Sequence, residues 1–126
     1  MPLFSKKDTT ETSYSKGVHG EKIAEDYLRE KGFSILKTRY KTKFGEIDII
    51  AKQSDLICFV EVKIRKNQAN ALESVTPKIQ RRIENAALFF LSENPECAQC
   101  DLRFDVIAIS GDAKISHLDN AWQART

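Results

Sequence analysis

The amino-acid sequence predicts an α/β protein with a central mixed sheet that is flanked by helices. Two segments carry apolar residues at helical spacing, and five shorter segments are rich in the β-branched and aromatic residues of strands. Their order is helix, three strands, helix and two strands, which favours helices that cover the faces of one sheet. A chain of 126 residues is the size of one such domain.

The two predicted helices have recognisable start and stop signals. The first is expected over residues 16–31, after a capping serine and before Gly32, which can end a helix. The second begins with Thr76 as its cap and Pro77 in its first turn, and it ends at Asn94. Each carries an apolar face, so both should pack against the sheet.

The strands are expected at residues 33–40, 45–51, 56–64 and 102–109, with a short last strand around Ile115. The second and third should form a hairpin that pairs Ala51 with Leu56 across a turn at residues 52–55. Residues 65–74 are expected to be a polar connection. We expect a flexible leader over residues 1–14, a single domain over 15–119 and a tail over 120–126.

Composition excludes some classes of protein and leaves others open. With 20 Lys and Arg against 18 Asp and Glu, the net charge of +2 identifies no partner. No apolar stretch is long enough for a membrane span, and the start of the chain does not resemble a signal peptide, so we expect a cytoplasmic protein. Cys58 should be a core residue. Cys97 and Cys100 form a single Cys-x-x-Cys, and because structural zinc requires four ligands, we do not expect a zinc site there.

Two carboxylates lie inside otherwise apolar strands, where charged residues are costly to bury. Strand alternation places Glu61 and Lys63 on one face of their strand. On the preceding strand, Asp48 should lie opposite the face formed by Ile47, Ile49 and Ala51. The expected hairpin register then sets Asp48 across from Phe59, with Glu61 as its diagonal neighbour, within joint reach of one ion.

Such a row suits metal-assisted hydrolysis of a phosphodiester. Mg²⁺ prefers carboxylate oxygens and keeps several waters, Mn²⁺ can substitute for it, and Lys63 could stabilise the charge that develops on phosphate. Glu21 and Gln80 occupy edge positions on the two helices and are further candidates. The alternative, that Asp48, Glu61 and Lys63 form the solvent face of a half-exposed hairpin, stays open.

Basic residues gather near these carboxylates in three groups, which could contact a nucleic-acid backbone. A solubilising surface is the alternative. No stacking or zinc-finger motif accompanies them, so any DNA recognition should depend on structure and not on sequence. The residues singled out for DNA binding are Lys37, Arg39, Lys41, Lys43, Arg65, Lys66, Lys78 and Arg82.

The spacing from Asp48 to Glu61-Val62-Lys63 resembles the PD-(D/E)xK nuclease signature. Four segments in the same order, over roughly residues 17–109, resemble the YraN-like family of predicted bacterial endonucleases. They are Gly20-Glu21-x-x-Ala24-x-x-Tyr27-Leu28, Gly45-Glu46-Ile47-Asp48-Ile49-Ile50-Ala51, Phe59-Val60-Glu61-Val62-Lys63-x-Arg65 and Arg103-Phe104-Asp105-Val106. The sequence departs from the pattern at Ile47, where the signature has proline, and at Arg39, where we expect asparagine.

The resemblance implies a restriction-endonuclease-like fold related to archaeal Holliday-junction resolvases. It also implies metal ligation by Asp48 and Glu61, with Glu21 as helper, Lys63 as the catalytic lysine, and a role for Gln80 or Lys78. The leading hypothesis is therefore a Mg²⁺-dependent DNA endonuclease acting on branched or repair-intermediate DNA, and a homodimer would suit cutting of two strands. The rival hypotheses are a nucleic-acid-binding module without catalysis and a structural adaptor.

Overall fold

The computed structural model describes residues 13–124 of the chain. Most of the expected leader, and the last two residues of the expected tail, lie outside the described residues. The elements in chain order are α1 (Ser13–Glu30), β1 (Ser34–Lys41), β2 (Glu46–Gln53), β3 (Leu56–Ile64), α2 (Gln68–Glu73), α3 (Pro77–Glu93), the 3-10 turn η2 (Pro95–Cys97), β4 (Asp101–Ile109) and β5 (Ile115–Trp122).

The five strands form one mixed sheet in the order β1-β2-β3-β4-β5. Strands β3 and β4 are parallel, and the other neighbouring pairs are antiparallel. The connection from β3 to β4 passes through α2 and α3, because parallel neighbours need a crossover. The predicted α/β class and element order are confirmed. No described helix is long and apolar enough to cross a membrane.

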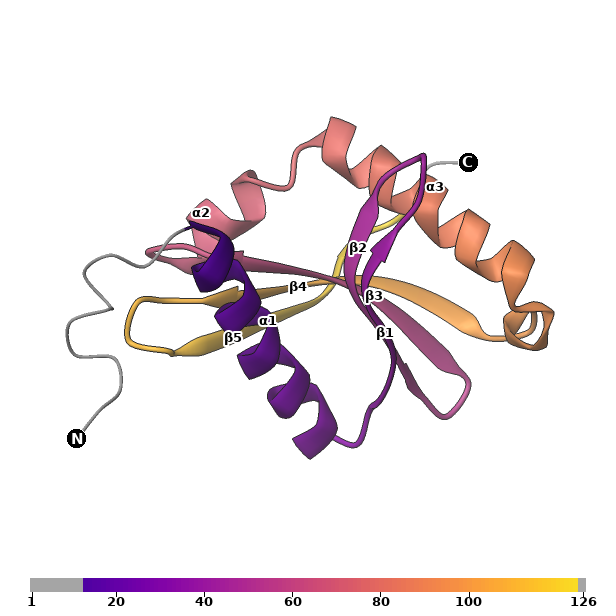
Figure 1. The fold of residues 1–126 in the computed structure, drawn as a ribbon, viewed down its shortest axis with the longest axis horizontal. Coiled ribbons are helices and arrows are strands. Elements are labelled where there is room, and N and C mark those ends of the chain that lie inside the picture. Colours follow the sequence, from indigo (N-terminus) through magenta and orange to yellow (C-terminus); the bar gives the residue numbers. More distant parts are fainter. Residues whose placement is uncertain (1–12, 125–126) are drawn as a thin grey trace.

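Helices cover both faces of the sheet, which gives three layers (Figure 1). On one face, Leu28 of α1 packs in a buried cluster with strand residues such as Val60. On the other face, Phe90 of α3 packs in a second cluster, where its ring meets that of Phe59 edge-on at 6.1 Å. The side chain of Thr76 accepts a hydrogen bond from the Ile79 N–H, which confirms the predicted start of α3.

Two segments differ from expectation. The polar connection contains the short helix α2, because the Asn67 side chain caps it by accepting from the Asn70 N–H and Ala71 is fully buried. Strand β5 runs to Trp122, three residues past position 119, because the Trp122 ring stacks on Phe104 at 5.1 Å and gains core burial.

The β2–β3 register is two residues away from the predicted one. Gln53 pairs with Leu56, so Ala51 lies opposite Cys58. Strand β2 runs two residues further than expected, to Gln53, and the tight turn before β3 includes Ser54 with a positive φ of 53°. Because the shift is even, every β3 side chain keeps its predicted face.

The alternation of β2 changes at Asp48. Ile49 belongs to the cluster under α1, whereas Ile47 belongs to the cluster under α3. The prediction that both isoleucines share a face is therefore wrong. Opposite this point β1 also departs from a regular strand, because Arg39 has a positive φ of 51°.

Candidate active site

The β2–β3 ladder ends where Asp48 begins to interact with the neighbouring strand through its side chain. The last recorded pair is Ile49 with Val60. Beyond it, the carboxylate oxygen Oδ2 of Asp48 accepts a hydrogen bond from the Val62 N–H at 2.8 Å. The Asp48 side chain thus accepts a backbone hydrogen bond from β3, which holds its carboxylate beside the strand that carries Glu61.

Asp48 and Glu61 are electrostatically coupled neighbours. Burial, and after it the negative charge of Glu61, raise the pKa of Asp48 to about 8, although the Val62 hydrogen bond and Lys63 oppose the rise. Two carboxylates in a half-buried site repel each other, and a bound cation would relieve that repulsion.

Lys63 completes the group on the α3 side of the sheet. Its ammonium nitrogen lies 3.2 Å from Oε2 of Glu61, and the two side chains are only 18% and 12% exposed. Strand alternation predicted that Glu61 and Lys63 share a face. Because both side chains are partly buried, their ion pair is screened less by solvent than an ordinary surface pair.

Glu21 approaches the same region from α1. Burial first, and then the charge of Asp48, raise the pKa of Glu21, while Arg39 lowers it. Arg39 Nη1 donates to Glu21 Oε1 at 3.1 Å. The helix comes close to β3 at Gly20, where a Cβ atom would lie 2.8 Å from the Ile64 side chain.

Gln80 and Lys78 lie at the start of α3. Gln80 is half-buried, and its Nε2 donates to the Val75 carbonyl at 2.9 Å, while Lys78 is exposed. Among the described residues, no three His, Cys, Asp or Glu side chains are arranged to hold a metal ion. The donor set near the carboxylates is therefore the pair Asp48 and Glu61, with Glu21 close by and bound to Arg39.

This pair fits a hard divalent cation. Carboxylate oxygens are the ligands that Mg²⁺ prefers, and Mg²⁺ needs only one or two of them because it keeps several waters. The coupled carboxylates also lie in a half-buried setting, where a cation would be screened less than at the open surface.

Lys37, Arg39, Lys41 and Lys43 occupy alternate positions, so an extended strand would present all four on one face, but they do not form one unbroken row. Strand β1 has a register shift between Ile35 and Lys37, and the chain turns at Arg39, which faces Glu21. Lys43 follows the strand, with its ammonium 5.4 Å from the centre of the Phe44 ring. The other basic residues singled out are exposed and remain candidates for phosphate contacts, namely Lys37, Lys41, Arg65, Lys66 and Arg82.

The turn after β1 rests directly on α3. A Cβ atom at Gly45 would lie 2.9 Å from the backbone oxygen of Arg82, so only glycine allows this approach without a shift. Arg82 Nε in turn donates to the Phe44 carbonyl at 3.4 Å. The contact brings basic residues of the two elements together at the end of β2 that carries Asp48.

Sequence reasoning missed a third strand carboxylate, Asp105 of β4, which is fully buried. Both of its oxygens accept from Arg103 at 2.9 Å, and His117 Nε2 lies 2.8 Å from Oδ2. The Tyr27 hydroxyl is 3.0 Å from Nδ1 of the same His117, so the network joins α1, β4 and β5. An acid within an apolar strand, the signal used for Asp48, would have identified it.

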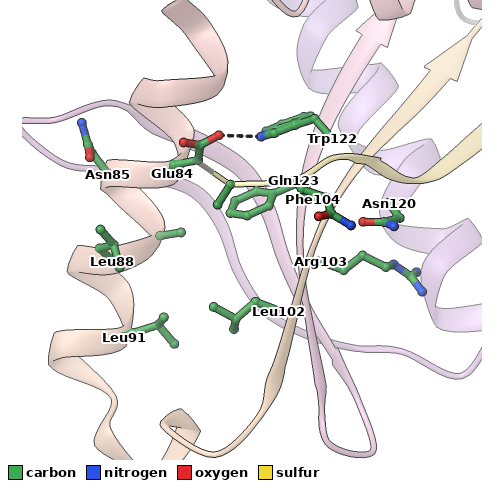
Figure 2. Close-up of a pocket in the computed structure, with 12 residues that line it drawn as sticks. Glu84, Asn85, Leu88, Leu91, Leu102, Arg103, Phe104, Asn120, Trp122 and Gln123 are labelled. Carbon is green, nitrogen blue, oxygen red and sulfur yellow. Dashed lines mark hydrogen bonds between the residues drawn. The ribbon is translucent and has the colours of Figure 1, made fainter. Parts of the chain in front are cut away.

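A separate cavity of about 500 Å³ lies between α3 and the strands β4 and β5 (Figure 2). At its edge the Trp122 indole donates to Glu84 at 2.8 Å, and Leu88 and Leu102 line its wall. None of the predicted site residues lines this cavity. The two thiols of the Cys-x-x-Cys lie elsewhere, Cys97 buried in η2 and Cys100 partly buried after it, and both are free.

Comparison with known proteins places the chain in a family. It matches the model of "Uncharacterised protein family UPF0102" over residues 20–109. A UPF0102 protein of Rhodopseudomonas palustris is 44% identical over 112 residues, which cover 89% of this chain and 86% of the relative. One of Chelativorans sp. is 43% identical, covering 90% and 91%, and one of Bartonella quintana is 45% identical, covering 82% and 85%. The chain belongs to the UPF0102 family.

Proposed function

We propose that the protein is a Mg²⁺-dependent endonuclease that hydrolyses phosphodiester bonds in DNA. The observation that carries this proposal is the half-buried group of Asp48, Glu61 and Lys63, in which two carboxylates adjoin and an ammonium lies 3.2 Å from one of them. Acid pairs beside a lysine suit phosphodiester hydrolysis, because the reaction needs a bound cation and a positive charge near the phosphate.

Each residue has a proposed role. Asp48 and Glu61 would hold the cation, and the Val62 N–H orients the Asp48 carboxylate through one oxygen. When bound, Mg²⁺ lowers the pKa of water and stabilises charge on the phosphate. Lys63 would stabilise the negative charge that develops on the phosphate oxygens.

Glu21 and Gln80 are proposed as helpers at the two sides of the sheet. Glu21 is already restrained by Arg39 and coupled to Asp48 from the α1 side. Gln80 is held by the Val75 carbonyl at the start of α3. Side chains fixed by such secondary contacts can orient groups near a metal without leaving their own element.

The resemblance to the YraN-like endonucleases supports the same reaction. It rests on residues 17–109, and the UPF0102 match covers nearly the same span, residues 20–109. We include in the proposal the restriction-endonuclease-like fold that this resemblance implies. The mixed five-stranded sheet with helices on both faces is compatible with it.

DNA would be held through its phosphates, with recognition of structure and not of sequence. The exposed lysines and arginines around the carboxylates supply that charge. Arg39 is less suited to this role than its neighbours on β1, because its guanidinium is bound to Glu21.

A nucleic-acid-binding module without catalysis is the second candidate. One observation favours it: in the described part of the chain, no three acidic or other ligand side chains converge on a metal position. The two candidates differ in what happens to DNA once it is bound.

A cleavage panel separates them. Single-stranded, duplex, flap and four-way-junction DNA are incubated with Mg²⁺, Mn²⁺ or a chelator, using the wild type and Asp48→Asn. We expect metal-dependent cutting of at least one substrate by the wild type and none by Asp48→Asn. DNA binding without cutting of any substrate in either metal would support the second candidate.

A further inference from the structure

We propose that a basic pocket at the carboxyl ends of β3 and β4 binds a second backbone phosphate of the DNA strand that lies in the candidate active site. This inference rests on the proposed function, and it adds a binding site that the comparisons do not assign. The pocket has a volume of about 600 Å³ and lies between the segment after β3 and the turn from β4 to β5.

The polar groups around the pocket are those that bind phosphate. Arg65, Lys66 and Lys114 bring three cations, and Ser116 brings a hydroxyl donor, whereas the Ser110 hydroxyl donates to Asp112. The three cationic side chains are exposed, so they can reach a ligand without unfolding any element. Phosphate in a nucleic acid is recognised by such a mixture of Lys, Arg and Ser groups.

One carboxylate, that of Asp112, also lines the pocket, but its oxygen is engaged within its own turn. Asp112 Oδ1 accepts from the Ser110 hydroxyl and, at 3.3 Å, from the Lys114 N–H. Three cations against one internally satisfied carboxylate leave the pocket positive. An anion could therefore bind there without a metal, in contrast to the carboxylate pair of the candidate active site.

The pocket lies in register with Lys63. Lys63 pairs with Ala108 of β4, and Ala108 pairs with Ser116 of β5, so the three form one row across the sheet. Neighbouring strands are about 4.8 Å apart, which puts the pocket floor only one to two strands from the lysine. Ala108 also belongs to the cluster under α3, on the side that carries Glu61 and Lys63.

A DNA strand is the ligand that fits both sites together. Its phosphates repeat along one chain, so one could lie at the carboxylates while a neighbour lies in the pocket. The pocket is open and lies beside Lys63, so one continuous DNA backbone could pass through both sites. A free phosphate or mononucleotide has the same chemistry and would occupy the pocket alone, whereas a DNA strand places phosphates at both sites at once.

The test measures DNA affinity in chelator, where no cleavage occurs, as a function of salt. The variant is Lys66→Ala with Lys114→Ala. The matched control is Lys31→Ala with Lys52→Ala, two cations near the β2–β3 turn, where Gln53 donates to the Lys31 carbonyl. Loss of the one phosphate contact made by the pocket should make the slope of log K against log salt shallower by about 0.9 on duplex DNA, while the control keeps the wild-type slope.

Each outcome decides the inference. A pocket variant with the slope of the control, or a wild type that binds no DNA in chelator, would overturn it. Inorganic phosphate is titrated separately, and binding to the wild type below about 1 mM with an unchanged DNA slope would assign the pocket to a free anion and also overturn it. A reduced slope together with no cleavage in the substrate panel would retain the pocket and reject the nuclease.

Discussion

The carboxylate of Asp48 accepts a hydrogen bond from the Val62 N–H at 2.8 Å, just beyond the last paired residues of β2 and β3. The bond replaces a backbone contact with a side-chain contact and holds one acid of the candidate site next to the strand of the other. Asp48 is thus positioned by the same structural irregularity that ends the ladder.

Replacing Lys63 should remove catalysis and leave the fold intact. Lys63→Ala is expected to lower the cleavage rate by about 100-fold or more, because a positive charge beside the reacting phosphate is lost. The loss of its partly buried ion pair with Glu61 should lower the melting temperature without unfolding the protein, and DNA affinity should change little. Single-turnover cleavage and DNA affinity are measured beside Lys52→Ala as control, and a wild-type rate in Lys63→Ala would exclude the proposed role.

The metal-free protein should become less stable as the pH rises through the titration of Asp48. Burial and the charge of Glu61 raise the pKa of Asp48 from its ordinary 3.8 to about 8. The folded state then binds this proton more tightly than the unfolded chain, so stability is full below the ordinary pKa and is lost as the pH rises toward the folded value.

Asp48→Asn tests this by removing the titrating group. In chelator, its advantage in unfolding free energy over the wild type should grow between about pH 5 and pH 8. Urea unfolding measures the difference, with the exposed α1 residue Asp26 changed to Asn as the control. If the unfolding free energies of Asp48→Asn and wild type change in parallel with pH, the pKa of Asp48 is not raised in the folded protein.

The contribution of Asp105 to stability should have the opposite pH dependence to that of Asp48. Burial alone would raise its pKa, but hydrogen bonds from His117, Arg103 and the Asn120 backbone together lower the pKa of Asp105 below its ordinary 3.8. The unfolded chain therefore binds this proton more tightly, and the stabilisation is present above the ordinary pKa and is lost as the pH falls below it.

Asp105→Asn should cost about 2–3 kcal/mol at neutral pH, because it removes a charged acceptor from Arg103 and His117, which stay partly exposed. Its stability should also fall less steeply than that of the wild type as the pH drops below about 4. Urea unfolding at neutral and acidic pH measures both effects. A variant that matches the wild type at neutral pH would show that the network is dispensable.

The contact between Gly45 and α3 predicts a stability cost for any larger residue. A Cβ atom there would lie 2.9 Å from the Arg82 oxygen, and backbone cannot move aside as a side chain can. Gly45→Ala should therefore destabilise by about 1–3 kcal/mol. Gly111→Ala is the control, since nothing lies within 4 Å of its added Cβ. Thermal melting compares them, and equal melting temperatures would reject the close packing.

Much of the fold could be predicted because the local patterns agree with tertiary packing. Thr76 and Pro77 mark the start of α3, and strict alternation on β3 separates Phe59 and Glu61 from their neighbours. The register error did not disturb these faces, because a shift of two preserves side-chain direction.

The finer parts of the site depend on contacts between distant segments, which alternation does not encode. The break at Asp48 requires a backbone donor from Val62, and Arg39 leaves its row because it pairs with Glu21. Sequence could pair Asp48 with Glu61 as neighbours, but it could not show that the two are coupled in a half-buried site. Tertiary packing decides that burial.

Manganese binding tests the central claim most directly, because it does not require knowledge of the DNA substrate. Calorimetry should show Mn²⁺ binding to the wild type, with affinity reduced by more than about tenfold in both Asp48→Asn and Glu61→Gln. Glu73→Gln, at an exposed residue of α2, should bind as the wild type does. Unchanged Mn²⁺ affinity in both site variants, or no binding by the wild type, would contradict a metal site at Asp48 and Glu61.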